Sequence, residues 1–249
     1  VIKSRHGFLL YNKNDIYIGK SIEKYGEFSY LEAKIFEQIC KDGDVVIEVG
    51  ANIGAHTLYL SKLVGNGFVF AFEPQRLVFQ NLCANLALNS ISNVFAYQEA
   101  VSNENGTIII PECNFKENNN FGGINIENTK NGTTVNKQKL DNFLNKIDRL
   151  KLLKIDVEGM EISVIKGASE LIKKFRPMIY VENDRQEHSK ELIELLWSLD
   201  YKMYWHLPKL YNENNFFNDK ENIFGNIVSV NMFCIHKDSN IKILDMTEV

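Results

Sequence analysis

The sequence predicts an α/β protein whose core is a largely parallel sheet with helices packed against it. From residue 44 onward, short apolar runs alternate with segments in which apolar residues recur at helical spacing. The first apolar run, residues 45–49, passes directly into a turn that contains two glycines and precedes a helical segment. This repeated order of strand, turn and helix is typical of parallel strands joined by right-handed crossovers.

The N-terminal part, residues 1–43, is expected to form a hairpin and a helix that pack on this core. Residues 8–11 and 16–18 alternate as two short strands would, with turn composition between them. Ser29-Tyr-Leu-Glu32 has the form of a capping box, and apolar residues keep helical spacing beyond it. A purely structural role at the helix N-terminus is therefore the preferred interpretation of Glu32.

Residues 44–249 are expected to form the main domain, in one globular unit with the N-terminal part. Residues 107–140 interrupt the alternation with an Asn/Gly-rich tract, 112–136, that fits a hairpin or loop insertion. A polar, aromatic loop at 207–226 separates the last two strands. The predicted strands are 45–49, 68–72, 94–97, 152–156, 178–181, 202–206 and 228–235, and the predicted helices are 57–64, 77–88, 161–172 and 190–199.

The composition indicates a hydrophobic core and no excess of basic residues. Hydrophobic residues make up 45% of the 249, and a net charge of -4 offers no electrostatic footprint for DNA or RNA. A small molecule is therefore the expected partner. The apolar runs are too short to span a bilayer and the N-terminus lacks an apolar signal core, so a cytoplasmic location is expected. The widely separated cysteines, expected to be reduced, are Cys40, Cys83, Cys113 and Cys234.

The glycine turn carries a carboxylate at a place where a phosphate-binding turn would repel its ligand. The NAD fingerprint G-x-G-x-x-G is not met between Gly50 and Gly54, because Asn52 takes the place of the second glycine. Glu48, two residues before Gly50, would repel a pyrophosphate. S-adenosylmethionine (SAM) has an ammonium, a sulfonium and no phosphate, so the same charge favours it.

A second carboxylate follows the next predicted strand. Glu73 lies nineteen positions after Gly54, where an acidic side chain accepts hydrogen bonds from ribose hydroxyls, and Pro74 ends the strand there. In this order and spacing, the two carboxylates predict a nucleoside-bearing cofactor, above all SAM. His56 and Thr57, in the first turn of the next helix, have two equal interpretations. They contact the cofactor, or the histidine is solvated and the threonine caps the helix.

Three segments of the chain resemble the FkbM family of class I SAM-dependent methyltransferases. They are Asp44-Val-Val-Ile-Glu-Val-Gly-Ala-Asn-Ile-Gly-Ala-His-Thr57, Phe70-Ala-Phe-Glu-Pro74 and Leu152-Leu-Lys-Ile-Asp-Val-Glu-Gly-Met-Glu161. The resemblance implies a Rossmann-like three-layer sandwich with a seven-stranded mixed sheet. It also implies that Glu99 and Ala100 border the adenine, and that the methyl group goes to an oxygen, with a bias toward sugars of glycans or natural products. Asn52 replaces a glycine of the class motif, as FkbM-like sequences commonly do.

Polar side chains follow the predicted fourth and fifth strands, at the edge where open parallel sheets bind ligands. Asp156 and Glu158 come at the end of the fourth strand, and Glu182, Asn183 and Asp184 at the end of the fifth. O-methylation needs a hydroxyl that is deprotonated and aligned with the methyl group. Asp156 is the first choice for a catalytic or substrate-positioning group that also borders the cofactor, and Glu158 and Glu182 are further catalytic candidates.

The same groups also suit a divalent cation such as Mg²⁺, which prefers hard oxygen ligands. The expected ligands are Asp156, Glu182 and Asn183, an arrangement that resembles metal-dependent catechol and sugar O-methyltransferases, where Asp is more usual than Glu at position 182. The structural alternative is that Asp156 bonds the glycine turn, Glu158 caps a helix and Glu182 is solvated. Lys154, inside a strand expected to be buried, is explained as well by a carboxylate partner as by catalysis.

The late loop supplies another base candidate and several aromatic rings. His206 can act as a general base near neutral pH. Trp205, Tyr211, Phe216 and Phe217 have the makings of a wall that covers the apolar faces of a sugar. An ordinary loop with aromatic side chains tucked into the core explains the same residues equally well.

The sequence thus predicts a SAM-dependent O-methyltransferase that acts on a hydroxyl of a small molecule, with a sugar as the favoured acceptor. Two alternatives stay open. A SAM-binding module without catalysis would need Glu48 and Glu73 but not the later carboxylates. An NAD-dependent oxidoreductase would have to tolerate both Glu48 and Asn52.

Overall fold

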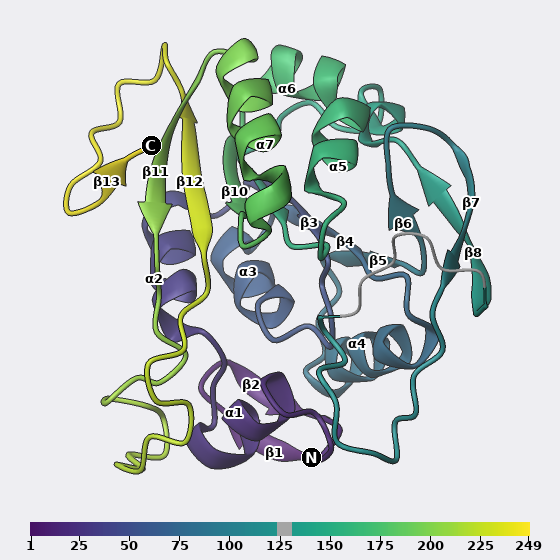
Figure 1. Ribbon diagram of the computed structural model, residues 1–249, viewed down its shortest axis with the longest axis vertical. Helices are drawn as coiled ribbons and strands as arrows, with labels where there is room; N and C mark the ends of the chain where they lie inside the picture. The colour runs from purple at the N-terminus through teal and green to yellow at the C-terminus, as the bar shows by residue number, and fades with distance from the viewer. Residues whose placement is uncertain (124–130) are drawn as a thin grey trace.

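An eight-stranded mixed sheet forms the centre of the protein (Figure 1), seen here in a computed structural model that describes residues 1–123 and 131–249. The order of the strands is β13-β11-β12-β10-β9-β3-β4-β5. Seven strands match the predicted mixed sheet, and the eighth, β13, adds two residues at one edge. The bounds are β3 Val45–Val49, β4 Phe68–Phe72, β5 Val94–Tyr97, β9 Leu152–Ile155, β10 Met178–Glu182, β11 Tyr201–His206, β12 Asn231–His236 and β13 Thr247–Glu248.

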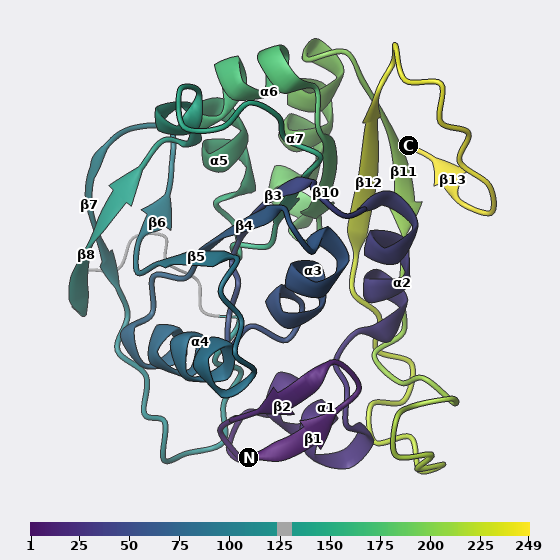
Figure 2. The same cartoon turned by 180° about the vertical axis from the view of Figure 1, so that it is seen from behind.

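Helices cover both faces of this sheet and complete the predicted three layers (Figures 1 and 2). Both faces of the sheet need helices because successive side chains along each strand point to opposite faces and most of them are apolar. In β3, for example, Ile47 and Val49 pack in the cluster with α5, α6 and α7, whereas Val46 packs in the cluster with α2 and α3. The bounds are α2 Tyr30–Ile39, α3 Thr57–Val64, α4 Arg76–Leu88, the 3-10 turn η1 Leu140–Phe143, α5 Glu161–Gly167, α6 Ser169–Phe175 and α7 Gln186–Ser198.

One helix predicted over 161–172 is two helices, α5 and α6. A Cβ atom on Gly167 would lie 2.0 Å from the backbone oxygen of Ser102, so the chain approaches its neighbour closely where α5 ends. Several other bounds differ from prediction by one residue, and two differ by more, since α7 begins four residues earlier, at Gln186, and β12 begins at Asn231 rather than at residue 228. No described helix has both the length and the apolar character that a bilayer crossing requires.

The N-terminal part contains a hairpin, but the predicted pairing of residues 8–11 with 16–18 was wrong. The hairpin pairs β1 (Ile2–Ser4) with β2 (Gly7–Leu9), and residue 18 begins a helix, α1 (Ile18–Tyr25). Ile18, Ile22 and Tyr25 are buried at helical spacing, and the Asp15 carboxylate accepts a hydrogen bond from the N–H of Tyr17 just before the helix.

The Asn/Gly-rich insertion contributes to a second, small sheet. This small sheet has the strand order β6 (Ala100–Val101), β8 (Thr133–Gln138), β7 (Gly106–Ile110). β7 pairs antiparallel with β8, as expected of a hairpin. The part of the predicted tract at residues 124–130 lies outside the described residues.

Candidate active site

A cavity of about 330 Å³ opens where the parallel strands β3, β4, β9 and β10 end. A smaller cavity of about 40 Å³ adjoins it on the side of β4 and β6 and is lined in part by Pro74, Glu99 and Ala100. The two cavities therefore form a continuous surface at the carboxyl edge of the sheet, where ligands of open α/β sheets bind. The residues that line both cavities are Gly50, Gly122, Glu73, Asp156 and Glu158.

Strand periodicity explains why polar groups gather here on one face. Leu153 and Ile155 of β9 point into the cluster with α5 to α7, so Lys154 between them points to the opposite face. Register then places Lys154 beside Glu48 of β3. β12 runs antiparallel to β10, so its first residue, Asn231, lies at the same edge beside Glu182. Four neighbouring strands thus present polar side chains to one cavity.

The glycine turn after β3 is shaped by close contact with β9. Gly50 has φ +83°, and a Cβ atom there would lie 1.7 Å from the backbone oxygen of Asp156, so only glycine fits. Asn52 also has a positive φ, of 51°, a conformation that asparagine adopts more readily than most residues. Its presence in place of a motif glycine therefore preserves the turn. Gly54, at φ +87°, completes it before α3.

Glu73 is held by the glycine turn itself. Its Oε2 accepts a hydrogen bond of 3.0 Å from the N–H of Asn52, and its Oε1 accepts one of 2.8 Å from the N–H of Gln75. Burial raises the pKa of Glu73 to about 7. A carboxylate has about four acceptor positions, so both oxygens keep capacity for the hydroxyls of a ligand.

Glu48 is a buried carboxylate fixed from two sides. The Thr57 hydroxyl donates a 2.6 Å hydrogen bond to its Oε2, and the Lys154 ammonium lies 3.8 Å from its Oε1. Thr57 is fully buried and does not line the cavity, so it orients Glu48 from behind. Burial opposes the charge of Lys154, but Asp156, Glu48 and Glu32 outweigh it and raise the pKa of that lysine.

Three carboxylates converge beyond β9 and β10. Oxygens of Asp156, Glu158 and Glu182 all lie within 4.8 Å of one another. Oε2 of Glu182 is buried without a hydrogen-bond partner among the described residues, and burial raises its pKa well above the ordinary value. Burial and the charge of Asp156 raise the pKa of Glu158 to about 7, although Arg185 donates a 2.7 Å hydrogen bond to it. Such a donor set fits a hard divalent cation.

The side chain of Asn183 was expected to lie beside these carboxylates, but it points elsewhere. Its amide nitrogen lies 3.3 Å from the sulfur of Met232, and it lines neither cavity. Glu158 takes its place in the cluster.

The two histidines named by the sequence lie in different environments. His56 lines the main cavity, is 6% exposed, and its Nε2 has no hydrogen-bond partner among the described residues. Burial keeps its pKa well below the ordinary value, so the ring is neutral. Nδ1 of His206 lies 2.7 Å from the hydroxyl oxygen of Tyr180, and the residue lines neither cavity.

The expected aromatic wall is also placed elsewhere. Trp205, Tyr211, Phe216 and Phe217 do not line the cavities. Tyr211 packs on Tyr25, while Phe216 and Phe217 pack on each other. The apolar lining comes instead from Tyr17, Ile18, Phe28, Leu210, Ile227, Val228 and Val230.

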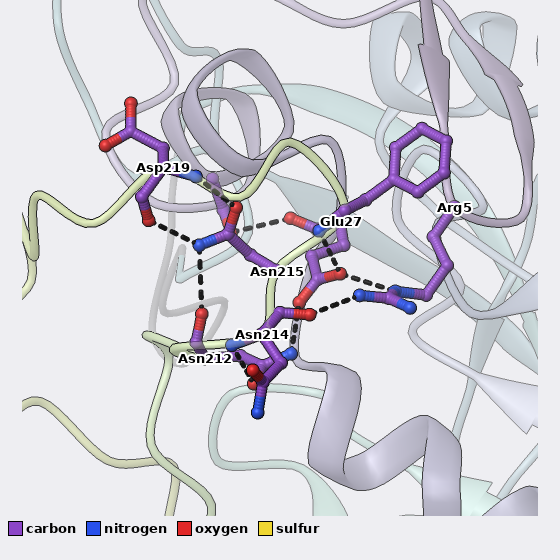
Figure 3. A network of polar contacts seen from close by, with 8 residues as sticks. Arg5, Glu27, Asn212, Asn214, Asn215 and Asp219 are labelled. Atoms are coloured by element: carbon purple, nitrogen blue, oxygen red, sulfur yellow. Dashed lines mark hydrogen bonds and ion pairs between the residues drawn. The ribbon is translucent and has the colours of Figure 1, made fainter.

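A network of polar contacts holds the late loop against the N-terminal part (Figure 3). The buried Glu27 carboxylate accepts hydrogen bonds from Arg5 at 2.5 Å, from the Asn212 amide at 2.8 Å and from the N–H of Phe216 at 3.0 Å. Arg5 also donates to the backbone oxygen of Asn214. The network fixes the segment between Leu210 and Ile227, two apolar residues of the cavity lining.

Glu32 is a site residue that the sequence did not reveal. It lines the cavity from α2, is 4% exposed, and accepts hydrogen bonds at Oε1 from Ser29, at 2.6 Å, and from Asn231, at 3.4 Å. The predicted capping box is therefore a bond between two side chains, since the Ser29 hydroxyl does not cap the helix backbone. Burial raises the pKa of Glu32 to about 7. The capping-box pattern concealed this position, and only its burial beside Lys154 reveals it.

Comparisons with known proteins agree with this geometry. The family model described as Methyltransferase FkbM domain matches residues 48–203. Methyltransferase sdnD of Sordaria araneosa is 28% identical over 181 residues, which cover 58% of this chain and 70% of that protein. Hexuronic acid methyltransferase AglP of Haloferax volcanii is 25% identical over 178 residues, which cover 71% of this chain and 70% of that protein.

Solved structures of methyltransferases share the fold. Methyltransferase FkbM from Methylobacillus flagellatus aligns with a TM-score of 0.51 and 17% identity over 82% of this chain, which spans only 50% of that longer chain. Precorrin-6y C5,15-methyltransferase from Geobacter metallireducens aligns with a TM-score of 0.51 and 13% identity, covering 82% of this chain and 87% of that one. The fold is the predicted Rossmann-like fold of class I methyltransferases. Because the family model matches more than half of the sequence, the chain belongs to the FkbM family of methyltransferases.

Proposed function

We propose that the protein transfers a methyl group from SAM to a hydroxyl of a small molecule or glycan, with a sugar as the favoured acceptor. The observation that carries the proposal is the position of Glu48 and Glu73 at one glycine turn between two adjoining cavities. Glu73 would accept the ribose hydroxyls, and Glu99 and Ala100 would border the adenine in the smaller cavity. Glu48 would face the cationic methionine end.

The acidic lining favours SAM over NAD. A pyrophosphate would lie among Glu48, Glu73 and Asp156, whose charges repel it, whereas the ammonium and sulfonium of SAM are attracted. SAM supplies an electrophilic methyl group, and the acceptor oxygen displaces the sulfur while the hydroxyl proton leaves. Asp156 borders both cavities and is the residue proposed to position that hydroxyl and take its proton.

A divalent ion such as Mg²⁺ is proposed as an additional component. Asp156, Glu158 and Glu182 would hold it, and the unpartnered Oε2 of Glu182 is the atom that fits this role best. Bound there, the ion would polarise the acceptor hydroxyl. Because Asn183 turns to Met232, it does not belong to this ligand set.

Calorimetric titration with SAM, S-adenosylhomocysteine and NAD, each with and without magnesium, tests the cofactor. Binding of both SAM-type ligands without binding of NAD is expected, and the reverse result would replace the proposal with an oxidoreductase. A screen of sugars with methyl-labelled SAM then tests transfer. SAM binding that persists without transfer to any acceptor would favour a binding module over an enzyme.

A further inference from the structure

The ionisable side chains that line the main cavity are overwhelmingly acidic. Seven acidic side chains and one ammonium group face it, and among the described lining residues Lys154 is the only Lys or Arg. That ammonium lies 3.4 Å from Asp156 and 3.8 Å from Glu48, so both of its close partners are carboxylates of the protein. The acidic lining residues are Glu32, Glu48, Glu73, Asp156, Glu158, Glu182 and Asp184.

Neighbouring cations do not change this balance. Arg185 lies behind the lining, where it donates to Glu158 at 2.7 Å and lies 3.4 Å from Asp184. The charge of a divalent ion held by Asp156, Glu158 and Glu182 would be neutralised by those three ligands and would leave no excess positive charge in the cavity. Glu32 and Asp184 would still face the remaining space. SAM adds only one net positive charge, and Glu48 already offers a counter-charge for its ammonium.

Two unpartnered polar atoms show what the cavity offers to a ligand. Nε2 of the neutral His56 ring and Oε2 of Glu182 are both buried without a hydrogen-bond partner among the described residues. His56 is 6% exposed and lies on the cavity wall, where Nε2 can donate to or accept from a hydroxyl. Glu182 can accept from a hydroxyl or an ammonium group. An acceptor carboxylate would instead meet repulsion from the ionised acidic side chains, and the one cation among the described lining residues, Lys154, is already paired with Glu48 and Asp156.

The remaining wall is apolar and suits the carbon faces of a sugar ring. Leu210, Ile227, Val228 and Val230 line it from the late segment, and Phe28 lines it from the N-terminal part. An apolar wall opposite hydrogen-bonding groups is the arrangement that covers a sugar face and satisfies its hydroxyls.

We infer that the acceptor is a polyhydroxylated molecule without an acidic group, neutral or amine-bearing, and that this site rejects uronic acids and other hydroxy acids. The inference rests on the proposed function and narrows its substrate class. It separates this chain from the relative AglP, whose name describes it as a hexuronic acid methyltransferase. Identity of 25% leaves room for a different lining.

Matched acceptors test this inference on the 249-residue chain. Methyl glycosides of a hexose, the corresponding 2-amino sugar and the corresponding uronic acid, in the gluco, galacto and manno series, are incubated with SAM at one ionic strength. Formation of S-adenosylhomocysteine is followed with magnesium and with a chelator. We expect product from a neutral or amino sugar at a rate at least tenfold above its matched uronate. A uronate that reacts as fast as its neutral partner, or a panel in which no neutral or amino sugar reacts, overturns the inference.

Charge-neutral variants show whether the lining causes the selectivity. Glu32→Gln and Asp184→Asn are expected to reduce the preference over the uronate severalfold, whereas Glu191→Gln, on the exposed surface of α7, keeps it. An unchanged preference in both cavity variants would show that their charges do not exclude acids. Calorimetry with SAM separates the two claims. Failure to bind SAM defeats the proposed function, whereas SAM binding with preferred transfer to a uronate defeats only the acceptor class.

Discussion

Lys154 and Glu48 are direct neighbours on adjacent parallel strands, and the lysine ammonium lies 3.8 Å from the glutamate carboxylate with both side chains almost fully buried. A buried charge is tolerated only with a partner, because removal from water is costly. Lys154 has a second partner in Asp156, at 3.4 Å. It therefore holds together two carboxylates that would otherwise repel each other beside the glycine turn.

Replacing Lys154 by methionine is expected to destabilise the protein by about 3–5 kcal/mol, because carboxylates stay buried without their cation. Urea unfolding measures this change. Lys166→Met is the matched control, since its pair with Glu191 is exposed and screened by water and therefore contributes little to stability. Adding Glu48→Gln to Lys154→Met should recover part of the loss. Equal stability of the Lys154 and Lys166 variants would contradict the central role of this ion pair.

Glu73→Ala is expected to weaken SAM binding by about tenfold to a hundredfold, because the ribose hydroxyls lose a charged hydrogen-bond acceptor worth roughly 1.5–3 kcal/mol. Calorimetry gives the affinity. Glu112→Ala is the control, because it makes the same substitution at a glutamate that lines a third cavity with Arg76 and Cys113 and neither of the two cavities of the candidate site. Unchanged affinity in Glu73→Ala would remove this residue from the cofactor site.

The raised pKa values predict how the ligand-free protein responds to pH. Glu32 and Glu73 have folded pKa values of about 7, against an ordinary value of 4.5, because burial disfavours their charge. Between these values the folded state binds more protons than the unfolded state, so the free energy of unfolding falls as pH rises. The slope is at most about 1.4 kcal/mol per pH unit for each group. Urea unfolding from pH 4.5 to 8 measures it, and Glu32→Gln should flatten the curve.

Ligand binding should follow the opposite trend. Because SAM would favour the ionised form of Glu73, its affinity is expected to rise between pH 6 and 8, with release of protons. Calorimetry in buffers of different ionisation enthalpy detects that release. Affinity that is independent of pH would mean that the titration of Glu73 is not linked to binding.

Glu27→Gln tests the contact network between the N-terminal part and the late loop. The variant keeps the shape of the side chain but removes the charge that faces Arg5. It also replaces one acceptor oxygen, so the pairing with Asn212 or Phe216 is disturbed. We expect a loss of about 2 kcal/mol in stability. Acceptor affinity should decline more than SAM affinity, since the loop lies between Leu210 and Ile227, which both line the cavity wall. Glu23→Gln, in an exposed pair, is the control. A decline of SAM affinity alone would contradict this account.

The sequence predicted the elements and site residues that are determined by local hydrophobic periodicity and by turn residues. β3, α3 and β4 have the predicted bounds, because each is a short periodic segment beside a turn. Glu48 and Glu73 lie at predictable strand ends for the same reason. Glu32 shows where this reasoning stops, because its pairing with Asn231 joins residues 199 positions apart. Asn183 and His206 show it too, since a strand end fixes the edge of the sheet but not the direction of each side chain.

Asp156→Asn is expected to reduce turnover by at least a hundredfold, because the amide cannot take a proton from the acceptor hydroxyl. Folding should be affected far less. The backbone oxygen that packs on Gly50 is unchanged, and the side chain is 42% exposed, so its pairing with Lys154 is screened. The measurement is kcat on an acceptor from the sugar screen, beside urea unfolding and SAM calorimetry. Glu170→Gln, exposed on α6, is the control. An unimpaired kcat would refute the catalytic role, and a loss of stability that matches the loss of activity would reassign Asp156 to the architecture of the turn.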